Sequence, residues 1–156
     1  MAFVPLHEYF PELAEKETRF ITVLDGTDTG LPPASYGFVE AFCNERGCDC
    51  RRVFFLVTSC ARKGLQTVVA WGWEKPEFYA RWMTSPDPHS IADLMGPALN
   101  TLSPQSELAP AILKLARDVL LQDPAYVERV KQHYAIFRRK IDGAKRRSLK
   151  KGRFRR

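Results

Sequence analysis

The order of two apolar patterns constrains the fold of this chain more than any other feature. Turn-forming residues separate four β-prone apolar runs, which lie at 18–24, 36–42, 52–58 and 65–73. Two segments with helical spacing follow, each opened by a polar residue and a proline, at Ser103-Pro104 and Asp123-Pro124. Strands followed by helices favour an α+β fold, here an antiparallel sheet of about four strands packed by C-terminal helices.

Each helical segment carries an apolar stripe at the spacing of one helix face. The first stripe is Leu108, Ile112, Leu115 and Val119, and the second is Val127, Val130, Tyr134, Phe137 and Ile141. We expect the first helix to run to about Gln122. The second should end at Ile141, before Gly143.

Length and composition limit the number of domains. A chain of 156 residues with 45% hydrophobic side chains can bury one core but hardly two. No apolar run is long enough to cross a bilayer, and the N-terminal stretch, interrupted by Pro5 and Pro11, lacks the pattern of a secretory signal. We therefore expect one domain, residues 1–142, with a cytoplasmic location and no membrane partner.

The net charge of +6 is concentrated at the C-terminal end. Residues 138–156 carry eleven Lys or Arg and one Asp, whereas residues 1–137 have a net charge of −4. Residues 143–156 have too few apolar side chains to bury, so we predict a basic, disordered tail.

Such a basic block gains affinity for nucleic acid or another polyanion by releasing counterions. The residues assigned to this role are Lys145, Arg146, Arg147, Lys150, Lys151, Arg153, Arg155 and Arg156. Two alternatives stay open: the tail only aids solubility, or it pairs with the acidic surface of its own domain.

Three of the four cysteines form a C-x4-C-x-C block between the second and third predicted strands. A hairpin loop, with Gly47 in a left-handed conformation, would bring Cys43 back to Cys48 and Cys50. Zinc binds four ligands in a tetrahedron and accepts thiolate sulfur readily. The sequence therefore predicts a structural zinc site with these three cysteines as ligands.

The fourth ligand has to come from elsewhere in the chain. Cys60 lies at the far end of the next strand, roughly 30 Å away at about 3.3 Å per residue. The remaining candidates are His7, His89 and His133. We predict His133, because it stands on a long helix that can pack beside the hairpin.

Other interpretations of the cysteines stay open. Buried reduced cysteines also behave as small hydrophobic residues. Arg51 and Arg52 could lower a thiol pKa and create a nucleophile, although the C-x-x-C spacing of thioredoxin-type sites is absent. No H-x-E precedes the block to supply a general base. The leading function is thus a zinc-stabilised binding module; the alternative is a zinc-dependent hydrolase or a thiol redox enzyme.

Large aromatic side chains form a second concentration, at Trp71, Trp73, Phe78 and Trp82. Such rings can stack on nucleic-acid bases. They also dominate the energetics of protein cores. We favour the core interpretation, with these rings joining the sheet to the helices.

The run YGFVEAFCNERGCDCRRVFF, followed by AWGWEKPEFYARWM, GPALNTLSPQSELAPAIL and YVERVKQHYAIF, resembles a family of uncharacterised bacterial proteins. Some members of that family carry a C-terminal SEC-C zinc motif. The resemblance covers most of residues 18–141, and the C-x4-C-x-C block with its arginines is the most specific part. It implies zinc at Cys43, Cys48 and Cys50 and implies no reaction. This chain differs in its ending, where a basic tail stands in place of a further Cys-rich motif.

Overall fold

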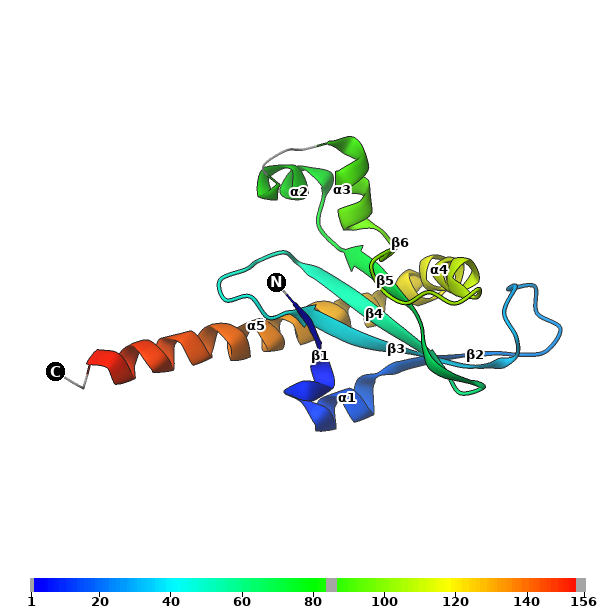
Figure 1. Ribbon diagram of the computed structural model, residues 1–156, viewed down its shortest axis with the longest axis horizontal. Helices are drawn as coiled ribbons and strands as arrows, with labels where there is room; N and C mark the ends of the chain where they lie inside the picture. The colour runs from blue at the N-terminus through cyan, green and yellow to red at the C-terminus, as the bar shows by residue number, and fades with distance from the viewer. Residues whose placement is uncertain (1, 84–86, 154–156) are drawn as a thin grey trace.

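The computed structural model describes residues 2–83 and 87–153, with side chains described through residue 143. These residues form one antiparallel sheet of six strands and five α-helices (Figure 1). The predicted α+β class and the antiparallel sheet are confirmed. The predicted number of strands is wrong, since the sheet has six rather than four.

The strands are β1 (Phe3–Pro5), β2 (Arg19–Val23), β3 (Ala34–Cys43), β4 (Arg52–Ser59), β5 (Arg62–Gly72) and β6 (Ala98–Leu99). Their order across the sheet is β1-β3-β4-β5-β6, and β2 also pairs with β3. Strands β2 to β5 coincide with the four predicted runs. The two additional strands were missed because two or three residues are too few to show an alternating pattern.

The helices are α1 (Pro11–Glu17), α2 (Pro76–Trp82), α3 (Pro88–Met95), α4 (Ala109–Asp118) and α5 (Pro124–Arg153), with 3-10 turns at Leu6–Glu8 and Leu120–Gln122. Helix α5 does not end before Gly143, so that predicted boundary is wrong. A glycine in a helix interior costs only about 1 kcal/mol, and the Ala, Lys, Arg and Leu residues beyond it favour helix. No helix in the described ranges has both the length and the apolar character needed to span a membrane.

One face of the sheet is covered by α5. The Phe137 ring lies 5.5 Å from the Phe42 ring of β3, and the Tyr126 ring lies 6.4 Å from the Phe55 ring of β4. Helices α2 and α3 lie together beside β5 and β6 (Figure 1). The C-terminal part of α5, drawn in orange to red, continues beyond the sheet (Figure 1). The loop between β3 and β4 contacts the middle of α5 through Tyr134, Arg138 and Asp142.

Candidate metal centre

The three clustered cysteines meet at one end of the β3–β4 hairpin. Cys43 is the last residue of β3, and Cys48 and Cys50 lie in the connecting loop. Their three Sγ atoms all lie within 4.8 Å of one another, and none is in a disulfide. A tetrahedral zinc site with bonds of about 2.3 Å places its sulfur atoms about 3.8 Å apart. These thiols could therefore bind a metal ion.

Two left-handed residues bend the loop. Gly47 has a φ of 74°, which confirms the conformation predicted for it, and Arg51 has a φ of 49°. A residue with a Cβ at such a φ costs roughly 1 kcal/mol. The Arg51 backbone is held from both sides: its N–H donates to the Tyr134 hydroxyl at 3.1 Å, and its carbonyl accepts from the Tyr79 hydroxyl at 3.0 Å. The loop conformation thus depends on α5 and on α2.

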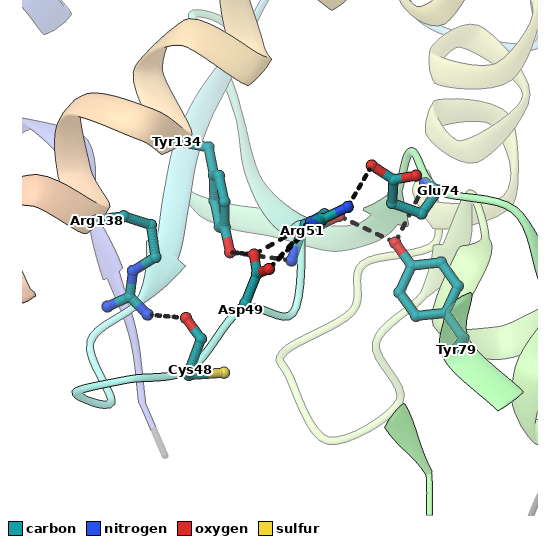
Figure 2. Close-up of polar contacts among 7 residues, drawn as sticks. All are labelled: Cys48, Asp49, Arg51, Glu74, Tyr79, Tyr134 and Arg138. Carbon is teal, nitrogen blue, oxygen red and sulfur yellow. Dashed lines mark hydrogen bonds and ion pairs between the residues drawn. The ribbon is translucent and has the colours of Figure 1, made fainter. Parts of the chain in front are cut away.

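Helix α5 also holds the first half of the loop (Figure 2). The Arg138 Nη1 donates to the carbonyls of Glu45 and Cys48, at 3.0 and 2.6 Å. One turn further along, the Asp142 carboxylate accepts from the Gly47 N–H at 2.9 Å. Tyr134, Arg138 and Asp142 are spaced by four residues and therefore lie on one face of α5. This face contacts the loop along its length.

The carboxylate of Asp49, between two of the cysteines, has two side-chain partners. It pairs with Arg51 at 2.9 Å and accepts from the Tyr134 hydroxyl at 2.9 Å (Figure 2). The Arg51 hydrogen bond, opposed by burial and aided by Tyr134, holds the pKa of Asp49 below its usual range. Arg51 also pairs with Glu74 at 3.1 Å. Asp49 therefore supports the loop and is not positioned as a fourth ligand.

Two buried arginines flank the thiols without a carboxylate partner among the described residues. Arg52 is 9% exposed and Arg138 is 8% exposed. The Nε and Nη2 atoms of Arg138 are buried and make no hydrogen bond with any described residue. Burial lowers the pKa of Arg52, and negative charge on Cys50, followed by other nearby groups, would raise it. Buried cations are normally paired with anions, so this region has the charge environment of a site for a negative group.

Two of the three thiols, those of Cys43 and Cys50, are poor nucleophiles without a metal. Burial, followed by the charge of Cys48 and Cys43, raises the pKa of Cys50 to about 12. Burial is also the main cause that raises the pKa of Cys43. Both thiols therefore keep their protons at neutral pH, and a bound metal would displace these protons. The expectation that Arg51 activates a thiolate loses support, because Asp49 and Glu74 already pair with its guanidinium.

The structure does not bring His133 to the cysteines. Its Nδ1 lies 2.8 Å from a Glu40 carboxylate oxygen, and its Nε2 contacts the carboxylate of Glu17. Both ring nitrogens are thus engaged, and the prediction that His133 completes the metal site loses its support. The reason is helical spacing: Tyr134 and Arg138 face the loop, whereas His133 points to the buried carboxylate of β3.

The other proposed fourth ligands are also placed elsewhere. The Cys60 Sγ accepts from the Ser35 N–H at 3.3 Å, at the opposite end of the hairpin, as its distance along the strand predicted. His7 lies in the Leu6–Glu8 turn and His89 in α3. Within the described part of the chain, the thiol group contains three cysteines and no further ligand.

Several residues that build the centre were not identified from the sequence. Tyr134 was assigned to an apolar stripe, and neither Arg138 nor Asp142 was assigned a role. Their common spacing of four residues was the available signal. The prediction that the aromatic residues join the core is confirmed for Trp71 and Trp73, which pack against it; the Trp73 ring lies 5.0 Å from the Tyr134 ring. It is wrong for Trp82, which is 38% exposed.

The basic residues assigned to nucleic-acid binding lie at the end of α5 and beyond it. Lys145 to Arg153 belong to the helix, and Arg155 and Arg156 lie outside the described residues. Their side chains are outside the described part as well, so their role stays a prediction.

Comparison of the chain with protein-family models, curated proteins and solved structures finds no match. The resemblance to the bacterial family with SEC-C members therefore stays a prediction. The chemistry of the centre has to be argued from its own geometry.

Proposed function

We propose that this protein is a zinc-stabilised binding module that attaches to nucleic acid through its basic C-terminal segment. The observation that carries the proposal is the grouping of three Sγ atoms within 4.8 Å. Zinc is the metal of choice because it combines a preference for thiolate sulfur with tetrahedral geometry and no redox chemistry.

Local charge supports a bound metal. Three thiolates and one divalent ion carry a net charge of −1, which the guanidinium groups of Arg52 and Arg138 can offset. Without the metal, two buried cations have no carboxylate partner among the described residues. A zinc–thiolate group would supply the negative charge that this environment lacks.

A structural role is supported by the way the loop is held. Two of the three thiols are buried, and α5 fastens the loop with three side chains. The fourth corner is left for a water molecule or for a ligand supplied by a partner. The thiol redox alternative has less support, because the raised pKa values of Cys43 and Cys50 oppose a reactive thiolate.

Metal analysis of the purified full chain tests the zinc assignment. We expect about one zinc per chain, with three additional thiols becoming reactive after chelation. Replacement of zinc by Co²⁺ should give the absorption of a tetrahedral site with sulfur-to-metal charge transfer. Protein with little metal and three thiols that react without chelation would refute the assignment.

The nucleic-acid part of the proposal depends on the continuity of α5. The same helix that fastens the metal loop through Tyr134, Arg138 and Asp142 runs on to Arg153 in the basic segment. The described helix thus links the metal loop directly to a region of high positive charge. Such a region binds phosphate backbones with little sequence preference.

Charge removal within the segment tests this part separately. In the full chain, the five changes Lys145→Gln, Arg146→Gln, Arg147→Gln, Lys150→Gln and Lys151→Gln keep good helix formers. Duplex DNA binding should weaken, and the slope of log K against log salt should fall by about four. Equal binding by both proteins at low salt would exclude the segment as a nucleic-acid arm.

A further inference from the structure

A groove lies between the sheet and the α2–α3 pair. It has a volume of about 470 Å³. Its lining includes Phe54 of β4, Leu94 of α3 and Leu99 of β6. Pockets that hold small organic ligands are commonly about 300–1,000 Å³ and largely apolar, with a few polar groups. The groove has the size of such a pocket, and polar residues, including Ser90, Asn100 and Thr101, share its lining with the apolar ones.

Arg52 forms part of the wall of this groove. Its Nε donates to the Leu94 carbonyl at 3.0 Å, which fixes the guanidinium between β4 and α3. No hydrogen bond or ion pair with a described residue uses its two terminal nitrogens. The Arg52 side chain is only 9% exposed, and its two terminal nitrogens have no hydrogen-bond acceptor among the described residues.

Aromatic rings stand next to this cation. The Arg52 guanidinium carbon lies 5.4 Å from the centre of the Phe54 ring. Phe54 is itself stacked on Phe3, with ring centres 3.7 Å apart. Trp82, 38% exposed, also lines the groove. The groove thus offers flat apolar surface beside its positive charge.

Two positive charges, those of Arg52 and Arg138, flank the thiol cluster, and neither has a carboxylate partner among the described residues. A zinc ion with three thiolates would carry a net charge of −1, which still leaves one of the two positive charges unbalanced. Among the described residues that line the groove, the one acidic side chain is Asp93, which is exposed and forms no ion pair with Arg52. An anion in the groove would balance the remaining positive charge.

We propose that the groove is a binding site for a small aromatic carboxylate. The carboxylate would accept two parallel hydrogen bonds from the terminal nitrogens of Arg52, a geometry that suits a guanidinium. The ring would lie against Phe54 and Trp82. A single cation matches a monovalent carboxylate better than a divalent phosphate, which Asp93 would also repel. The proposal does not depend on the metal assignment.

Three matched probes test the chemistry on the full chain. We expect 2-naphthoate to bind about tenfold more tightly than neutral 2-naphthamide, because a charged hydrogen-bond pair is worth about 1.4 kcal/mol more than a neutral one. 2-Naphthyl phosphate should bind more weakly than the carboxylate. Amide chemical shifts in the NMR spectrum should change at Arg52, Leu94 and Leu99.

Three variants locate the site. Arg52→Gln should weaken 2-naphthoate binding roughly tenfold and change 2-naphthamide binding much less. Arg81→Gln is the matched control, because Arg81 is exposed on α2 and does not line the groove. Asp93→Asn removes the opposing charge at an exposed position and should tighten 2-naphthoate binding about threefold.

The Asp93 variant keeps the test decisive if Arg52→Gln fails to fold, because its expected effect has the opposite sign. Equal binding of naphthoate and naphthamide would overturn the proposal. So would binding weaker than about 1 mM, or shifts that map to another surface. Tighter binding of the phosphate would overturn the choice of a carboxylate.

Discussion

Two polar sites lie under the same helix and differ in how completely they are satisfied. In the histidine site, His133 stands between Glu40 and Glu17, and the Tyr126 hydroxyl donates to Glu40 at 3.2 Å. Each ring nitrogen has a carboxylate partner. In the thiol site, one turn further along α5, Arg138 leaves two buried donor atoms without a described partner.

This difference distinguishes two uses of buried polar groups. A closed network such as the histidine site needs nothing further and serves the fold. Burial of cations without a charged partner costs free energy, so an arrangement of thiols and unpaired cations is unfavourable unless another charged group binds there.

Removal of one thiol should have the largest effect. We expect Cys48→Ser to lose the metal and to lower the melting temperature strongly, because zinc binding is coupled to folding and is worth roughly 10 kcal/mol or more in small zinc domains. Metal content and thermal unfolding measure this. Cys60→Ser is the matched control and should retain both metal and stability. A Cys48→Ser protein with the wild-type melting temperature would show that the centre is not structural.

Disruption of the histidine site should cost less and leave the metal in place. His133→Ala removes the partner of two carboxylates, one of them buried, so we expect the free energy of unfolding to fall by about 3–5 kcal/mol. Denaturant unfolding gives this value. Zinc content should stay at the wild-type level. Loss of zinc from folded His133→Ala protein would contradict the separation of the two sites.

Removal of the guanidinium beside the thiols should weaken metal binding without abolishing it. Groups that support metal ligands typically contribute a factor of about 10–100 to affinity. We expect a loss in this range for Arg138→Met in competition with a chelator. Arg139→Met changes the neighbouring exposed arginine and should have no effect. Equal zinc affinity in the two variants would show that the charge of Arg138 does not contribute to metal binding.

The smallest effect concerns pH. Burial alone would lower the pKa of His133, but the hydrogen bonds and charges of Glu40 and Glu17 outweigh it and raise the pKa. The folded protein thus holds the proton more tightly than the unfolded chain does. The resulting stability is fully present below the unfolded pKa of about 6.5 and is lost as pH rises through the higher folded pKa.

The comparison of wild type with His133→Gln isolates this contribution. The difference in their free energies of unfolding, with both proteins loaded with zinc, should shrink as pH rises from about 6 to about 8.5. A difference that grows over this range would mean that His133 is neutral in the fold.

The sequence was informative where the pattern is long or local. Strands β2 to β5 each have at least five residues, so the β-prone runs identified them, whereas β1 and β6 depend on pairing with β3 and β5. The three cysteines were identified as a group because they fall within eight consecutive residues of the sequence. Gly47 was assigned its conformation for the same local reason.

The α+β class, the grouping of the thiols and the position of the positive charge could be predicted from the sequence alone. These features depend on neighbours in the chain, through side-chain alternation, helical period and turn chemistry. Tertiary packing, in contrast, sets which face of α5 meets the loop. One residue along a helix rotates a side chain by about 100°, so His133 joins Glu40, whereas Tyr134 contacts Asp49 and Arg138 contacts the Cys48 carbonyl in the loop. It also decided that Arg52 is buried between β4 and α3, because 42 residues separate it from Leu94 and only packing brings them together.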